Sequence, residues 1–193
     1  MGLHQLFVHI NKTVPLNSDE EKTITSKATV RKFLKGQFLV QQGDVCKHES
    51  FVLSGCLKTF YTDAEGQEHI VMFAIENWWT ADLGSFITQT PARYNVQCLD
   101  NTEVVQLSFE ALEELYQKVP KLERFFRIII QRAFASSWHR ITDLHSIPAK
   151  ERYLKFREQY PAIEQRVPQY MIASYLGITK EFLSKIRNQL ALD

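Results

Sequence analysis

The sequence predicts an α+β fold: an antiparallel jelly-roll β-barrel, then a long helix, then a helix-turn-helix. Three observations support this order. Short strand-forming runs separated by glycine turns extend from about Ala28 to Leu107. A helical pattern then runs from Pro120 to about His145, and a pair of helices joined at a glycine lies near the end. We expect a barrel domain over 1–118, a long helix over 119–146 and a helix-turn-helix domain over 147–193.

Two short helices are expected ahead of the barrel, where they would cover it. Apolar residues recur at helical spacing between Leu3 and Ile10, and the acidic run after Asn17 is typical of a capped helix start. Seven short runs rich in Val, Phe, Leu and Tyr then predict the strands, namely Val30–Leu34, Gln37–Gln41, Ser50–Leu53, Leu57–Tyr61, His69–Phe73, Tyr94–Cys98 and Val104–Leu107.

The region after the barrel predicts further helices. The first is expected over Phe109 to Gln117, and Pro120 begins the second. Along the second helix, residues separated alternately by four and three positions form a seam at heptad spacing, namely Ile130, Phe134, Ser137, Ile141 and Leu144. This spacing is typical of a helix paired with a twin from another subunit, and packing on the chain's own barrel is the alternative. We expect both, with the first half on the barrel. Pro148 marks a hinge before a helix over Ala149–Tyr160.

A helix-turn-helix is predicted around Gly177. Pro168 can start the first helix, and Gly177 stops it because glycine adopts positive φ without steric cost. Thr179 can cap the second helix, whose Leu183 and Ile186 face back to the first. An ordinary helical hairpin is the alternative, and the agreement of these residues at fixed offsets argues against it.

The outward face of the second helix is polar, which is typical of a helix that enters the major groove of DNA. Its outward residues are Lys180, Glu181, Ser184, Lys185 and Asn188.

Charge is distributed in agreement with this interpretation. The net charge is only +1, but residues 146–193 hold eight Lys and Arg against five Asp and Glu, a balance of +3. The rest holds 15 against 17, a balance of −2, so positive potential concentrates on the helix-turn-helix.

The three cysteines, Cys46, Cys56 and Cys98, lack the short spacing of a zinc or redox site. Buried reduced thiols and a cytoplasmic location are expected. No secretory signal is recognised, and no apolar run approaches the roughly eighteen residues of a membrane helix, so no membrane partner is expected.

The order barrel, long helix, hinge and helix-turn-helix resembles the Crp/Fnr superfamily of bacterial transcription regulators over nearly the whole chain. The residues that carry the resemblance are Lys35-Gly36, Gln42-Gly43-Asp44, Leu53-Ser54-Gly55, Asp63-Ala64-Glu65-Gly66 and Ile172–Arg187. It implies a cyclic-nucleotide-binding-type barrel, a winged-helix-like C-terminal domain and a homodimer on a palindromic DNA operator. It also implies a small-molecule effector of unknown identity, RNA polymerase as a further candidate partner, and no enzymatic activity.

Residue roles follow from the resemblance by position, with the recognition helix at 180–190. Residues expected to contact DNA are Gln169, Thr179, Lys180, Glu181, Ser184, Lys185, Arg187 and Asn188. Gln169 and Thr179 would touch phosphates, and Lys180 and Glu181 are among those that would read bases. Lysine donates to guanine and glutamate accepts from cytosine, which suits a G·C-containing half-site. Phe182 departs from a polar face and could pack inward or touch a thymine methyl.

The effector site departs from the cyclic-nucleotide pattern of the family. Ala81-Asp82 replaces its Gly-Glu pair, and Arg93 lies one residue beyond the expected arginine, which falls at Ala92. Tyr94 then replaces a small hydroxyl residue. A slip of one residue along a strand reverses the side-chain face, so cyclic AMP is not the expected effector. The N-terminal cysteines of an iron-sulfur sensor are also missing, and no cofactor or metal is expected.

Residues expected near an effector are Asp82, Arg93, Tyr94 and Trp79. Trp78, Trp79, Phe73 and His69 could line an apolar pocket, although such aromatic residues are more often core.

Two other classes remain open. One is a ligand-binding signalling barrel whose C-terminal helices mediate protein interaction. The other is a metal-binding cupin enzyme, suggested by His48-Glu49 and His69. The first cupin motif needs two histidines one residue apart, and position 50 is Ser50.

Overall fold

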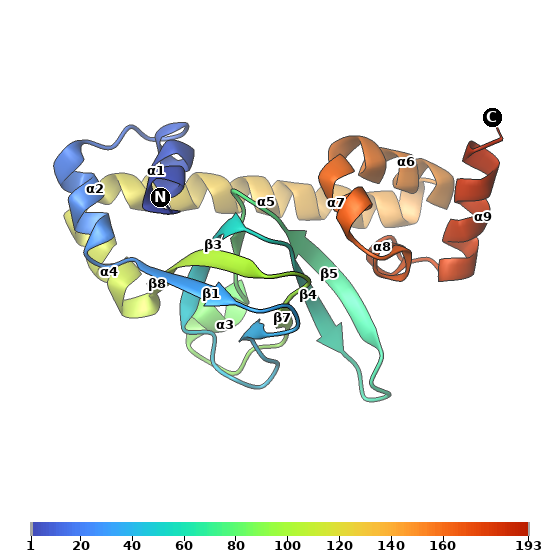
Figure 1. Cartoon of the computed structure of the whole chain (residues 1–193), viewed down its shortest axis with the longest axis horizontal. Coiled ribbons are helices and arrows are strands. Elements are labelled where there is room, and N and C mark those ends of the chain that lie inside the picture. Colours follow the sequence, from blue (N-terminus) through green and yellow to red (C-terminus); the bar gives the residue numbers. More distant parts are fainter. Residues whose placement is uncertain (1, 193) are drawn as a thin grey trace.

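The computed structural model describes residues 2–192. Two β-sheets form a barrel beneath α5 (Pro120–Ser146), a rod that crosses the molecule (Figure 1). The N-terminal helices lie at one end of this rod, and the C-terminal helices lie at the other (Figure 1).

The barrel is antiparallel throughout, as the glycine-turn pattern predicts. One sheet has the order β1 (Thr29–Phe33), β8 (Thr102–Ser108), β3 (His48–Ser54) and β6 (Trp79–Thr80). The other has the order β2 (Phe38–Val40), β7 (Asn95–Cys98), β4 (Leu57–Thr62) and β5 (Glu68–Ala74). Each of the seven predicted strands overlaps an observed one, so the α+β jelly-roll prediction is confirmed.

Two elements of the barrel were not predicted. They are β6 and the following α3 (Leu83–Thr88). A two-residue strand and a six-residue helix are too short to show a period of two or of 3.6.

The helices that flank the barrel agree with the prediction. They are α1 (Gly2–Asn11), α2 (Ser18–Thr25) and α4 (Phe109–Lys118). Asn17 caps α2 by accepting from the backbone N–H groups of Asp19 and Glu20, and the Glu20 carboxylate accepts from the Asn17 N–H in return. This reciprocal capping explains why α2 begins where the sequence predicts.

The main core fills the space between the two sheets and continues beneath the helices α1, α4 and early α5. Phe51 of β3 packs against Trp79, with ring centroids 5.4 Å apart, and Trp79 packs against Phe125 and Phe126 of α5. Early α5 is therefore part of the barrel's core, as predicted for its first half.

The second half of α5 presents an exposed apolar stripe. Its members and their exposed fractions are Ile130 38%, Phe134 64%, Trp138 55%, Ile141 46% and Leu144 37%. Four of the five belong to the predicted seam, while Trp138 stands beside the predicted Ser137. The twin helix that would cover this stripe stays a prediction.

The C-terminal part is helical, with α6 (Ala149–Gln159), α7 (Pro161–Arg166), α8 (Gln169–Tyr175) and α9 (Lys180–Leu190). Helix α7 was not predicted. The expected helix over Ala149–Tyr160 ends before Pro161, and this proline opens a further helix. Within residues 2–192 no strand follows β8, so the helix-turn-helix has no β-hairpin wing there and the winged-helix-like description is corrected.

None of the helices among these residues combines the length and the apolar character that crossing a membrane requires.

Candidate nucleic-acid interface

The turn between α8 and α9 has the predicted geometry. Gly177 has φ +67, and a Cβ at this position would lie 3.2 Å from Leu144 Cδ2 of α5. The Ile178 N–H donates to the Ala173 carbonyl at 3.0 Å, and Thr179 Oγ1 accepts from the Phe182 N–H at 3.2 Å. These bonds fix the angle at which α9 leaves α8.

A small core holds the two helices together. Ala173 is 1% exposed where the helices cross, and the other apolar residues that the sequence assigns to this contact are also buried, namely Ile172, Leu176, Leu183 and Ile186. The helix-turn-helix prediction is therefore confirmed in geometry and in packing.

Helix α9 lies at the far end of the molecule (Figure 1), and the residues of its polar face are exposed. The exposed residues among those expected to contact DNA are Thr179, Lys180, Glu181, Ser184, Lys185 and Asn188. Gln169, at the start of α8, is half-buried. Phe182 is 47% exposed, so it does not pack inward.

Arg187 differs from the other expected DNA contacts. Its Nη1 lies 3.3 Å from Glu164 Oε1, and the same carboxylate oxygen accepts from the Tyr153 hydroxyl at 3.0 Å. Arg187 therefore ties α9 to α6 and α7.

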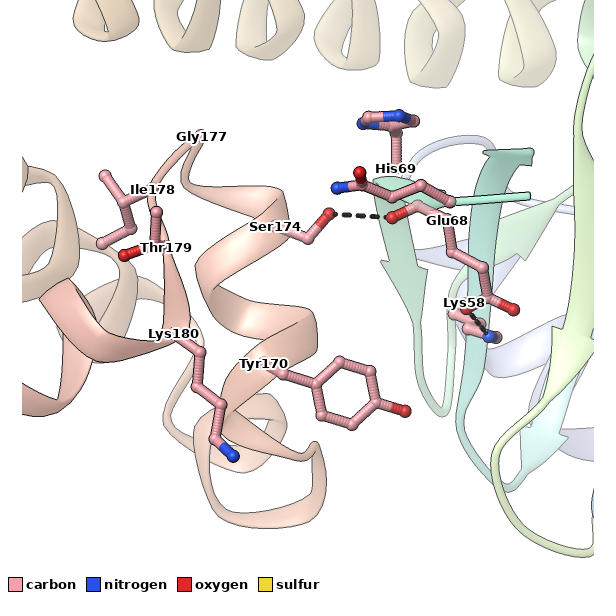
Figure 2. Close-up of a pocket in the computed structure, with 10 residues that line it drawn as sticks. Lys58, Glu68, His69, Tyr170, Ser174, Gly177, Ile178, Thr179 and Lys180 are labelled. Carbon is pink, nitrogen blue, oxygen red and sulfur yellow. Dashed lines mark hydrogen bonds and ion pairs between the residues drawn. The ribbon is translucent and has the colours of Figure 1, made fainter. Parts of the chain in front are cut away.

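A cleft of about 790 Å³ separates the start of α9 from the barrel (Figure 2). The barrel contributes Lys58, Gln67, Glu68 and His69, and the C-terminal helices contribute Tyr170, Ser174, Gly177, Ile178, Thr179 and Lys180. Lys58 pairs with Glu68 on the barrel side. Two expected DNA contacts, Thr179 and Lys180, thus lie beside the β4–β5 hairpin.

Tyr170 was missed by the sequence reasoning. It is 51% exposed and lies in this cleft on the same side as Lys180 (Figure 2). Its place off the helix face shared by Ile172, Ala173 and Leu176 was the available signal that it faces outward.

The first helix of the motif docks on the edge of the second sheet. The Ser174 hydroxyl accepts from the Ile70 N–H at 3.0 Å and donates to the Glu68 carbonyl at 3.4 Å (Figure 2). Strand β5 is the last strand of its sheet, so α8 covers an edge that would otherwise present unpaired backbone groups.

An ionic contact reinforces this docking. Arg166 of α7 donates to Glu76 at 2.9 Å and to Asp100 at 2.8 Å. These carboxylates also accept from the backbone N–H groups of Gly55 and Cys56, so they are fixed by the barrel's own turns. The hydrogen bond that the Arg166 guanidinium donates to Asp100 raises the pKa of this guanidinium, which favours its charged form.

The residues expected near an effector do not converge on one ligand. The Asp82 side chain is 4% exposed, and its carboxylate accepts from the backbone N–H groups of Ser85, Arg93 and Tyr94. Asp82 therefore caps α3 and holds the loop before β7. The Arg93 side chain is exposed, with its guanidinium carbon 6.0 Å from the centroid of the Tyr61 ring.

The aromatic residues are core or contact residues. Trp79 belongs to the main core, Phe73 packs on Tyr175 at 5.6 Å, and Trp78 packs on Tyr160 at 5.7 Å. His69 pairs instead with Asp63, with Nε2 2.7 Å from Oδ2. The contacts of the aromatic residues therefore agree with the core interpretation, the one that the sequence favours.

The cupin alternative finds no support in the geometry. His48 and His69 lie on strands of different sheets. Across residues 2–192, no three His, Cys, Asp or Glu side chains are grouped as metal ligands would be.

Comparisons with known proteins agree with this fold. A family profile described as "Cyclic nucleotide-binding domain" matches residues 30–119. The chain is 28% identical over 167 residues to the "Transcriptional activator protein anr" of Pseudomonas aeruginosa, which covers 81% of this chain and 68% of that protein.

Solved structures show the same architecture. The "c-di-GMP Responsive Global Regulator CLP" of Xanthomonas campestris superposes with TM-score 0.75 at 14% identity, covering 92% of this chain and 93% of that one. FixK2 of Bradyrhizobium japonicum gives TM-score 0.72 at 16% identity, covering 86% and 85%. At these identities the structures support the fold alone.

Proposed function

We propose that this chain, which belongs to the Crp/Fnr family of transcription regulators, is a homodimeric DNA-binding regulator whose barrel senses an effector. The division is the one the sequence suggests, with a sensor over 1–118, a dimerisation helix over 119–146 and a DNA-binding domain over 147–193. The observation that carries the proposal is the rigidly anchored α9, whose polar face is exposed while its apolar face is buried.

The exposed stripe on α5 supports the dimer. Five large apolar side chains in one row are costly to leave in water, and a second copy of the same helix covers them symmetrically. Because α5 contains 27 residues, it is about 40 Å long, enough to pass from the barrel to the helix-turn-helix of its own protomer. Pairing along the stripe would place two α9 helices about 34 Å apart, one turn of DNA.

Roles on DNA follow from position. Lys180, Glu181, Ser184 and Lys185 occupy the N-terminal part of α9, which reaches base edges in such motifs. Thr179 and Gln169 lie nearer the DNA backbone. Arg187 retains a supporting role in this proposal, since its contact with Glu164 orients α9.

The effector is a small molecule other than cyclic AMP. In the family's nucleotide binders a glutamate meets the ribose hydroxyl, and here the corresponding Asp82 carboxylate accepts three backbone bonds. Those N–H groups would lose a buried acceptor if Asp82 turned to a ligand.

The test is selection of binding sites from random duplex DNA, followed by titration of the selected sequence at fixed salt. The proposal predicts a palindrome bound with submicromolar affinity and a steep loss of affinity as salt rises. Binding that is weak and indifferent to sequence, in the presence of cell extract to supply an effector, would favour the signalling-barrel alternative.

A further inference from the structure

A second groove, of about 370 Å³, lies where the C-terminal half of α5 meets α6 and the end of α8. It shares no lining residue with the cleft of Figure 2. Its charged lining is mostly basic, with Arg140, Arg152 and Lys155 against a single carboxylate, Asp143.

The cations of the groove come from two helices and are held in place. The guanidinium carbon of Arg140, on α5, lies 4.7 Å from the centroid of the Tyr175 ring, which fixes the plane of the side chain. No carboxylate of the described chain pairs with Arg140. Lys155, on α6, has its Nζ 3.1 Å from Asp143 Oδ2, so the one acid already has a partner.

Arg152 has a donor with no acceptor. Its Nη1 donates to the Ile147 carbonyl at 2.8 Å and its Nη2 donates to the Leu176 carbonyl at 3.2 Å. Its Nε is buried and has no hydrogen-bond partner in the structure. An unsatisfied buried donor is unfavourable, so an acceptor that came within reach of Arg152 Nε would be stabilised.

We propose that this groove is a binding site for a small phosphate-bearing anion. Arg140, Arg152 and Lys155 outnumber Asp143 by two charges at neutral pH, which matches the charge of one phosphate group. Guanidinium groups bind phosphate through parallel N–H bonds, and the anion would join α5 to α6. The aromatic side chains of Tyr160 and Tyr175 form an apolar wall beside the cations.

The site is placed to act on the helix-turn-helix. Arg152 holds the carbonyl of Leu176, the residue before the Gly177 turn, so an anion on Arg152 bears on the joint between α8 and α9. This effect on DNA rests on the proposed function, whereas binding of the anion does not.

Calorimetric titration of the full chain with inorganic pyrophosphate tests the site. We expect saturable binding with one site per chain, at least tenfold weaker in Arg140→Gln and in Lys155→Gln. The matched control is Arg132→Gln, which removes the same charge from an exposed position of α5 outside the groove. It should bind pyrophosphate as the wild type does, and unfolding midpoints should show that all variants are folded.

Absence of saturable binding, or equal weakening in Arg132→Gln, would overturn the proposal. A second outcome would also overturn the proposal. If a selected DNA duplex displaces pyrophosphate, and if Arg140→Gln loses the same affinity for every DNA sequence, the groove binds the DNA backbone. Failure of the proposed function can be distinguished from failure of this anion site. In the first case pyrophosphate would bind as expected while no DNA sequence is selected.

Discussion

A buried carboxyl group in the barrel gives a stability prediction with a defined sign. Glu49 of β3 is 7% exposed, and its side chain makes no hydrogen bond or ion pair within residues 2–192. Burial raises the pKa of its carboxyl to about 7, from an ordinary value of 4.5. The perturbation we consider is Glu49→Gln, which keeps the shape of the side chain and removes its charge.

The sign follows from proton binding in the two states. Between pH 4.5 and 7 the folded chain keeps a proton on Glu49 that the unfolded chain has lost, so the free energy of unfolding falls as pH rises. Each unit of pKa difference is worth about 1.4 kcal/mol. The free energy of unfolding therefore falls by about 2–3 kcal/mol between pH 5 and pH 8, and the fall levels off above the pKa that Glu49 has in the folded protein.

Glu49→Gln lacks this dependence. The free energy of unfolding of the variant, relative to that of the wild type, should therefore rise by about 2–3 kcal/mol between pH 5 and pH 8. For a chain of this size this corresponds to roughly 5–10 °C in the unfolding midpoint. The assay is urea and thermal unfolding of both proteins across this range.

The contributions of other titrating groups near Glu49 to the pH dependence of stability are the same in both proteins and cancel in the comparison. Burial raises the pKa of the Cys46 thiol and of the Tyr116 hydroxyl, so both stay neutral in the folded protein up to pH 8. Burial lowers the pKa of His9 and of His48, and both are present in wild type and variant alike. A difference between the two proteins that is the same at pH 5 and pH 8 would refute the assignment of a raised pKa to Glu49.

Four further predictions concern the proposed function. Gly177→Val should abolish specific DNA binding while circular dichroism shows the barrel intact, because a β-branched residue at φ +67 costs about 1–3 kcal/mol; retained DNA affinity would contradict this. Lys185→Ala should weaken DNA binding about 5- to 150-fold with an unchanged unfolding midpoint, and a large fall in the midpoint would show that the lysine is structural. Phe134→Glu should give monomers in sedimentation, whereas Ile87→Glu, an equally exposed apolar site at 59% on α3, should leave the dimer intact. Calorimetry with cyclic AMP should show no binding at the barrel, and tight binding would mean that Asp82 leaves its backbone partners.

The sequence predicted the C-terminal motif in most detail because each feature there is local. A glycine at positive φ, a threonine cap and an apolar i, i+3 pair are all read from neighbouring positions, and each was found. The strands were located by their glycine turns. Their pairing order, with β1 beside β8 and β2 beside β7, depends on contacts between distant residues that no local pattern shows.

The effector site is the part of the molecule that the sequence defines least, for a physical reason. Asp82 was assigned by its place in a family pattern, whereas its carboxylate satisfies the first turn of α3 and the loop at Arg93. An aspartate at the start of a helix as short as α3 gives no sequence signal that separates capping from ligand binding. Arg93 is a similar case, because its side chain is exposed. Its shift by one residue along the strand can be recognised in the sequence only by comparison with the family pattern.

Docking of the helix-turn-helix on the barrel bears on how the two parts communicate. The helices α6 to α9 share one apolar core with Cys56, Phe60, Ile70 and Phe73 of the barrel. The orientation of α9 therefore depends on the α5 rod and on the β4–β5 hairpin together. A change in the barrel that moved the Ile70 N–H away from Ser174 would leave a backbone donor of an edge strand without its partner. Because Arg166 ties the same helices to two barrel turns, separation of the parts requires breaking ionic and apolar contacts at once, which favours two discrete arrangements over a gradual tilt.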